Sequence, residues 1–174
     1  MIKNAKKEIA LIRVLFAFLM VHFLALSIFG NKVTAEEQNK FGDWQRVCNE
    51  KACSILSFGV DPAGEKKARV SVSLSEPGKN GKIAEMTILS PLYSYLPYGL
   101  ITAIQNNKPI RHEFTLCATE GCFNFIPLAK EDIDLLKKEW NLVIAYQNSR
   151  LPNEKVVVDV SLVGFKKAFE SISD

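Results

Sequence analysis

The sequence lacks the short motifs by which many catalytic sites are recognised. It has no Gly-x-Ser-x-Gly nucleophile elbow, no phosphate-binding glycine loop and no His-x-x-x-His pair for a metal ion. Only two histidines are present, His22 and His112. These absences give no support to a serine hydrolase, a nucleotide-binding enzyme or a histidine-ligated metalloenzyme. We therefore expect no catalytic residue, no metal ion and no cofactor.

The chain also lacks a basic patch of the kind that binds nucleic acid. Its 22 Lys and Arg against 19 Asp and Glu give a formal charge of +3, but five of these basic residues and one acidic residue lie in the first 35 positions. The remainder has 17 basic and 18 acidic residues, a net charge of −1, and no run of Lys or Arg longer than two. Binding to a phosphate backbone needs clustered positive charge, so we expect no nucleic acid partner.

No apolar run has the length of roughly 20 residues that a membrane-spanning helix needs. The longest, residues 14–29, holds 16 residues and includes His22. It follows a basic stretch, residues 1–13, and precedes Val33-Thr34-Ala35, which places small residues at the −3 and −1 positions of a cleavage site. This order is typical of a secretory signal peptide, so we expect residues 1–35 to be removed and the mature part, residues 36–174, to work outside the cytoplasm without a transmembrane segment. An uncleaved membrane anchor is the alternative.

Cysteine is scarce, and all four cysteines lie in the expected mature part. They form two copies of one spacing, Cys48-x4-Cys53 and Cys117-x4-Cys122. An even number in an exported chain indicates disulfides, and we favour the two local pairs because each flanks a plausible turn. The spacing leaves crossed pairings open. A zinc site and a redox-active dithiol are alternatives, although the first usually has two-residue gaps and the second a Cys-x-x-Cys at a helix start.

Beyond residue 36 the sequence alternates short apolar runs with turn residues, which is the pattern of an all-β domain. The expected strands are 41–48, 52–59, 69–75, 83–89, 100–105, 110–116 and 156–162. Strand 69–75 alternates most clearly, with Val70, Val72 and Leu74 on one face and three serines on the other. We predict one disulfide-stapled domain, built as an antiparallel β-sandwich or a partly open barrel with one or two short peripheral helices.

Two helices are expected beside this sheet. Residues 130–140 carry acids at the start and lysines near the end, which complements the helix dipole. One face of this helix holds Ile133, Leu136 and Trp140. The second helix begins at Phe165, and its apolar face consists of Phe165, Ala168, Phe169 and Ile172. We expect it to pack on the sheet. A membrane-surface helix is the alternative, but such helices usually carry several cations on the polar face, and this segment has only Lys166 and Lys167.

His112 is the remaining histidine of the expected mature part. Within strand 110–116 its side chain shares a face with Ile110, Phe114 and Leu116. We interpret it as a buried histidine with a hydrogen-bond partner rather than as a general base.

Three of the four tyrosines, Tyr93, Tyr95 and Tyr98, lie close together between Pro91 and Leu100. The two prolines of this segment disfavour a central strand. Tyrosine side chains offer rigid, amphipathic contact area, so the three residues form a candidate partner surface. In the alternative interpretation the rings cap the open end of the sheet and pack against neighbouring strands.

Several different short motifs are present together in the expected mature part. They are Phe41-Gly42-Asp43-Trp44 followed by Cys48 and Cys53, Pro91-Leu92, Gly99-Leu100, Cys117 with Gly121-Cys122, and Ser161-Leu162-x-Gly164-Phe165 with Ala168. Over nearly the whole mature chain this combination resembles the invasion-associated locus B family of bacterial exported proteins. Where relatives tend to carry a short Pro-Leu-Gly turn, this chain has Pro91-Leu92-Tyr93-Ser94-Tyr95.

The resemblance implies a periplasmic or surface-associated protein of a Gram-negative bacterium that is connected with entry into host cells, erythrocytes in the best-known members. It implies no reaction and supplies no catalytic residue. We expect a virulence-associated protein that acts by contact with the host-cell surface or with a component of the bacterial envelope, and not an enzyme.

The runner-up is a periplasmic envelope-maintenance or small-ligand-binding domain that affects invasion indirectly. An apolar cavity in a barrel would favour it, and a filled sandwich core would count against it. A third hypothesis, a thiol oxidoreductase, predicts one exposed disulfide that is easily reduced.

Overall fold

The structure is a computed structural model that describes residues 39–75, 81–105, 107–151 and 153–173. The expected signal segment and its cleavage site after Ala35 lie outside these ranges. Within them, no helix is both long and apolar enough to cross a membrane. The strands are β1 (Lys40–Phe41), β2 (Trp44–Cys48), β3 (Cys53–Val60), β4 (Lys66–Leu74), β5 (Lys82–Ser90), β6 (Leu100–Ile104), β7 (Ile110–His112), β8 (Leu116–Ala118), β9 (Gly121–Ala129), β10 (Asn141–Gln147) and β11 (Lys155–Ser161). The helices are α2 (Lys130–Leu136) and α3 (Phe165–Ser173), together with a short 3-10 turn, η2 (Leu96–Tyr98).

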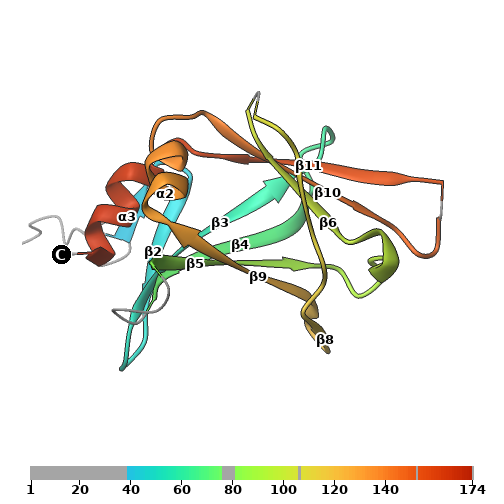
Figure 1. The fold of residues 1–174 in the computed structure, drawn as a ribbon, viewed down its shortest axis with the longest axis horizontal. Helices are drawn as coiled ribbons and strands as arrows, with labels where there is room; N and C mark the ends of the chain where they lie inside the picture. The colour runs from blue at the N-terminus through green and yellow to red at the C-terminus, as the bar shows by residue number, and fades with distance from the viewer. Residues whose placement is uncertain (1–38, 76–80, 106, 152, 174) are drawn as a thin grey trace, which may run out of the picture. The chain divides into compact units, whose positions relative to one another are not determined.

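All of these strands belong to one antiparallel sheet. Its order is β7-β6-β10-β11-β3-β4-β5-β9-β8, with β2 paired to β3 and β1 to β2. The sheet curls, as Figure 1 shows, so that the β6–β7 end approaches β9. The segment that follows β7 is joined to β9 by Asn124, whose Nδ2 donates to the Glu113 carbonyl at 2.6 Å. The fold is therefore all-β with peripheral helices, as predicted, and of the two predicted architectures it is the partly open barrel.

The core lies on the concave side of the sheet, and the period-two pattern of the strands explains it. Along β10, Leu142, Ile144 and Tyr146 are buried and alternate with more exposed residues. Val70 and Val72 of β4 are fully buried, whereas Leu74 of the same predicted face is 44% exposed because the strand ends there. This alternation places one face of each strand in the core and leaves the other in water.

Both helices lie at one end of the curled sheet (Figure 1). Ile133 and Leu136 of α2 and Phe165 and Phe169 of α3 are buried in the common core. The expected apolar face of residues 130–140 is wrong at Trp140, which is 72% exposed. The cause is that α2 ends at Leu136 and the chain turns before β10 begins. The buried face of α3 also removes the membrane-surface alternative, since the apolar side chains are already covered by protein.

The first and last motifs of the domain pack directly on each other. The Trp44 indole Nε1 donates to the Ser161 carbonyl at 2.9 Å across 117 residues of sequence, and the Asp43 amide donates to the Val163 carbonyl at 3.0 Å. The ring of Phe165 meets Trp44 edge to face, with centroids 5.0 Å apart, and both side chains are fully buried. We call this contact between residues 41–44 and 161–165 the terminal clasp. It gives these motifs a structural role.

Candidate functional site

The loop between β5 and β6 presents its tyrosines on the surface. Tyr93 and Tyr95 are 46% and 45% exposed, and their neighbours Leu92 and Leu96 are each 49% exposed. Tyr98, at the end of η2, is half-buried. We call these five residues the tyrosine surface. Tyr93 and Tyr95 thus do not pack in the core of the sheet.

The backbone under the tyrosine surface is firmly held. Buried Ser94 contacts the Ser90 hydroxyl at 2.9 Å, and its own hydroxyl donates to the Pro91 carbonyl at 2.8 Å. The amide of Tyr95 donates to the Gln147 carbonyl at 2.7 Å, and the Tyr93 carbonyl accepts from the Ser149 amide at 2.6 Å. These bonds fix the loop to the β10–β11 hairpin, so the rings project from an ordered support.

Positive charges lie over two of these rings. The guanidinium carbon of Arg150 is 3.2 Å from the centroid of the Tyr93 ring, and Lys155 Nζ is 5.9 Å from that of Tyr98. Such cation–π contacts orient the rings and cover part of their faces. Beside them lies a hollow of about 460 Å³ whose wall includes Tyr93, Lys155 and the buried Tyr146.

A second cavity lies where the two ends of the curled sheet approach each other. It has a volume of about 270 Å³ and is lined by β5, β6, β7, β9, α2 and β10. Most of its wall is aliphatic, with Met86, Ile104, Ile126, Leu128, Leu136 and Leu142 as principal members. Its polar wall residues are Thr102, Asn107, Lys108, His112 and Asp132. We call it the seam cleft. It is concave and mainly apolar with a few polar groups, which is the usual composition of a small-molecule site.

His112 is part of this cleft. Its Nε2 lies 2.8 Å from the Thr102 hydroxyl, and burial lowers its pKa, which favours the neutral imidazole. The structure corrects the predicted strand 110–116, because β7 ends at His112 and the chain crosses toward β9. Ile110 and Leu116 are accordingly 59% and 46% exposed instead of sharing a buried face with His112. The histidine is half-buried with a hydroxyl partner, and no carboxylate of the described residues is hydrogen-bonded to it as the orienting group of a general base would be.

Comparison with known proteins reveals both a family and a fold. The family model described as invasion associated locus B (IalB) protein matches residues 44–173. The chain belongs to this family. A crystal structure of invasion associated protein b from Bartonella henselae matches with a TM-score of 0.64 and 20% sequence identity, over 76% of this chain and 93% of that one. At this identity the likeness shows the shared fold. No curated protein matches the chain.

In this member of the invasion associated locus B family the four cysteines close two hairpins. Cys48 is bonded to Cys53 between β2 and β3, and Cys117 to Cys122 between β8 and β9. These are the local pairs favoured from the intervening turns. Because all four sulfurs are oxidised, they are not available as the thiolate ligands of a zinc ion, and that alternative is wrong. Neither bridge lies at a helix start, the setting that a redox-active dithiol usually has.

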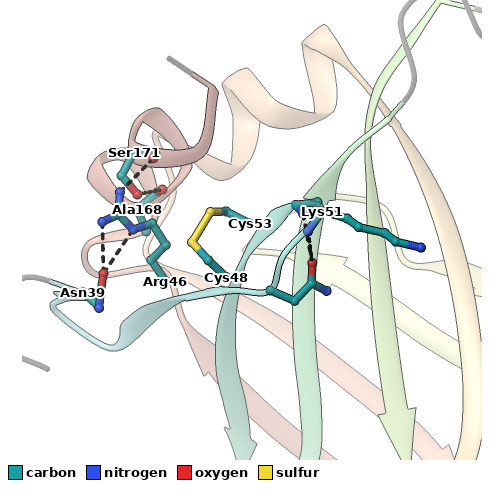
Figure 2. Close-up of a disulfide and its surroundings, with 9 residues drawn as sticks. Asn39, Arg46, Cys48, Lys51, Cys53, Ala168 and Ser171 are labelled. Atoms are coloured by element: carbon teal, nitrogen blue, oxygen red, sulfur yellow. Dashed lines mark hydrogen bonds between the residues drawn. A yellow bond between two sulfur atoms is a disulfide. The ribbon is translucent and has the colours of Figure 1, made fainter. Parts of the chain in front are cut away.

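The first disulfide lies near the carboxyl end of α3 (Figure 2). Between them, Arg46 of β2 donates from Nε and Nη2 to Asn39 Oδ1 at 3.1 and 3.0 Å and from Nη1 to the Ser171 carbonyl at 3.2 Å. A cation at the last carbonyls of a helix is stabilising because of the helix dipole. The disulfide and the Arg46 hydrogen bonds thus tie β2 and β3, the amino-terminal segment and α3 into one unit.

The sequence reasoning missed the seam cleft. Two of its wall elements, β9 and β10, were not among the expected strands. Alternating Leu142, Ile144 and Tyr146 could have indicated β10. In β9, Pro127 obscured the alternating pattern. At this position β9 pairs with β5 on one side, and β8 does not extend this far on the other. Prolines within sheets usually occupy such unpaired edges, because they have no amide hydrogen to donate.

Proposed function

We propose that this protein is an exported, virulence-associated protein that promotes invasion of host cells by contact rather than by catalysis. Membership of the invasion associated locus B family supports the connection with invasion. Two disulfides fit an oxidising compartment, which in a Gram-negative bacterium means the periplasm or the outer-membrane surface. The partner is a component of the host-cell surface or of the bacterial envelope.

The tyrosine surface is the observation that carries this proposal. Contact residues that dominate binding are often tyrosines, and a rigid support lowers the entropy lost when a partner binds. Here the Tyr93 and Tyr95 rings are exposed while the backbone beneath them is tied to Gln147 and Ser149. The nearby hollow adds concave area into which a partner group could fit.

The test replaces all three rings, as Tyr93→Ala, Tyr95→Ala and Tyr98→Ala, in the chromosomal copy of the bacterium. We expect normal export and folding but a clear loss of host-cell entry, since loss of a contact centre weakens binding by about tenfold or more. Trp140→Ala with Phe125→Ala is the matched control, because both aromatics are exposed and lie outside the tyrosine surface. Full entry by a folded triple variant would disprove the contact role of this loop.

A second candidate is the envelope-maintenance or small-ligand-binding role, which the seam cleft favours. The two functions differ in where the protein must lie. Protease and antibody accessibility on intact bacteria, with a periplasmic protein as control, separates them. Accessibility supports direct contact with the host, whereas protection until the outer membrane is opened supports the second candidate and makes the effect on invasion indirect.

A further inference from the structure

The wall of the seam cleft indicates the shape of its ligand. None of the described residues that line it is a Phe, Tyr or Trp, so it offers no flat ring for stacking. Met86, Leu128, Leu136 and Leu142 are almost fully buried and form the floor. Branched aliphatic side chains and a methionine adapt to flexible alkyl groups, and methionine in particular fills irregular space. The wall therefore suits an aliphatic chain better than an aromatic ring system.

The polar groups in the cleft are mostly occupied by protein partners. Thr102 and His112 contact each other. The Asn107 side chain donates to the Ile104 carbonyl at 3.0 Å, and Asp132 Oδ2 accepts from the Ala129 amide at 2.7 Å. These contacts leave few side-chain groups that require a polar ligand atom.

Lys108 differs from these residues. It is exposed at the edge of the cleft, and no carboxylate of the described residues forms an ion pair with it. Its ammonium group can therefore attract an anionic head group without first leaving a protein partner. Because the site is open to water on this side, the attraction is modest and sensitive to salt.

The volume limits the length of the chain. An alkyl carbon with its hydrogens takes up about as much space as a water molecule in the liquid, ~30 Å³. The volume of about 270 Å³ then holds roughly nine such groups.

We propose that the seam cleft binds a single medium-length alkyl chain that carries an anionic head group, with the chain between β6–β7 and β9 and the head group beside Lys108. This inference rests on the second candidate function, ligand binding, and is independent of the tyrosine surface. A free fatty acid, with its carboxylate, and an envelope lipid, with its acyl chain and phosphate, both have this chemistry.

The experiment measures binding of decanoate and decanol to the purified protein by isothermal titration calorimetry. Ile126→Trp puts a large ring into the cleft, and Ile83→Trp puts the same ring at an exposed position of β5 outside the cleft. Lys108→Ala removes the charge. Circular dichroism and thermal unfolding verify that each variant folds.

We expect decanoate and decanol to bind, Ile126→Trp to weaken both by about tenfold or more, and Ile83→Trp to change neither. Lys108→Ala should weaken decanoate by about threefold and leave decanol unchanged, because only the carboxylate meets the ammonium group. Absence of binding by both compounds, or equal binding by the folded Ile126→Trp variant, would overturn the proposal.

Two further arms separate the possible sources and the possible failures. Tighter binding of a lysophospholipid with a decanoyl chain than of decanoate assigns the site to an envelope lipid, and the reverse assigns it to free fatty acid. An anilinonaphthalene sulfonate probe tests ligand binding in general. If the probe binds in a manner that Ile126→Trp abolishes while decanoate does not bind, the alkyl-chain proposal is wrong but ligand binding by the cleft stands.

Discussion

Tyr146 is buried beneath the hollow beside the tyrosine surface, and its hydroxyl satisfies a backbone carbonyl that the sheet leaves unpaired. The pairing of β3 with β4 shifts register between Gly59 and Val60, which leaves Lys67 as the extra residue of a bulge. A bulged residue lacks its normal ladder partner. The Tyr146 hydroxyl donates to the carbonyl of this residue at 3.1 Å and satisfies it.

Tyr146→Phe should destabilise the protein by about 1 kcal/mol, the usual net contribution of such a hydrogen bond. Burial, together with the negative charge of Asp61, raises the pKa of Tyr146 to about 12. A folded-state pKa above the unfolded value of about 10 stabilises the fold below pH 10, and this contribution is lost as the pH rises toward 12.

Urea unfolding of both proteins between pH 8 and pH 12 checks this prediction. The difference in unfolding free energy should shrink above pH 10, because the wild-type phenol then gains from ionising in the unfolded chain. A difference that stays constant up to pH 12 would contradict the assigned role of the hydroxyl. The absorbance change of phenolate near pH 12 should also be smaller in Tyr146→Phe.

At the scale of elements, the terminal clasp depends on one close approach of two backbone segments. Gly164 has φ +89°, and a Cβ built on it would lie 1.9 Å from the Phe41 carbonyl oxygen. Only glycine permits β1 and the start of α3 to meet in this way.

Gly164→Ala should therefore cost about 3 kcal/mol or more, the sum of an unfavourable backbone conformation and a steric clash. Gly64→Ala is the matched control, since Gly64 also has a positive φ, +82°, but has no atom within 4 Å of the added carbon. It should cost only about 1 kcal/mol for the backbone alone. Thermal and urea unfolding of the two variants measure the difference, and equal losses would show that the clasp tolerates a side chain.

The elements that the sequence predicted well are those whose pattern is local. β3, β4, β5 and β11 alternate strictly or end at strong turn residues, and α3 repeats its apolar residues at helical spacing, so their existence follows from local sequence. The local disulfides follow from the short turns that they flank in the same way. The terminal clasp could not be predicted from local sequence, because its two motifs lie 117 residues apart and meet only in the folded chain.

Other features depended on tertiary contacts that no local pattern reveals. The predicted strand 110–116 is divided, because the chain must cross from β7 to β9 after His112. Trp140 has the right spacing for the apolar face of α2, but the helix ends before it and leaves it exposed. The seam cleft is the same kind of feature, since its wall combines strands that lie far apart in the sequence. Its apolar residues looked like ordinary core residues in the sequence.

At the scale of the whole molecule, the curled sheet has one continuous core and one weak boundary. β7 and β8 are three residues long and flank the seam, whereas β3, β4 and β5 pair over most of their length in the middle of the sheet. Strands with few buried apolar contacts open locally with a lower free energy than central strands. The seam is therefore the region where the barrel should open to admit a ligand.

Native-state hydrogen exchange followed by mass spectrometry tests this expectation. Amides of residues 110–118 should exchange about 100-fold faster than those of β4 and β5, because local opening of the seam does not require global unfolding. Saturating decanoate should slow exchange at the seam, where its binding would oppose opening, and also in β4, because that strand opens only with the whole domain and the unfolded chain does not bind the ligand. Equal protection of the seam and the central strands would mean that the barrel opens as one unit. An alkyl chain could then enter only through the mouth beside Lys108, and Lys108→Ala would change the rate of entry as well as the affinity.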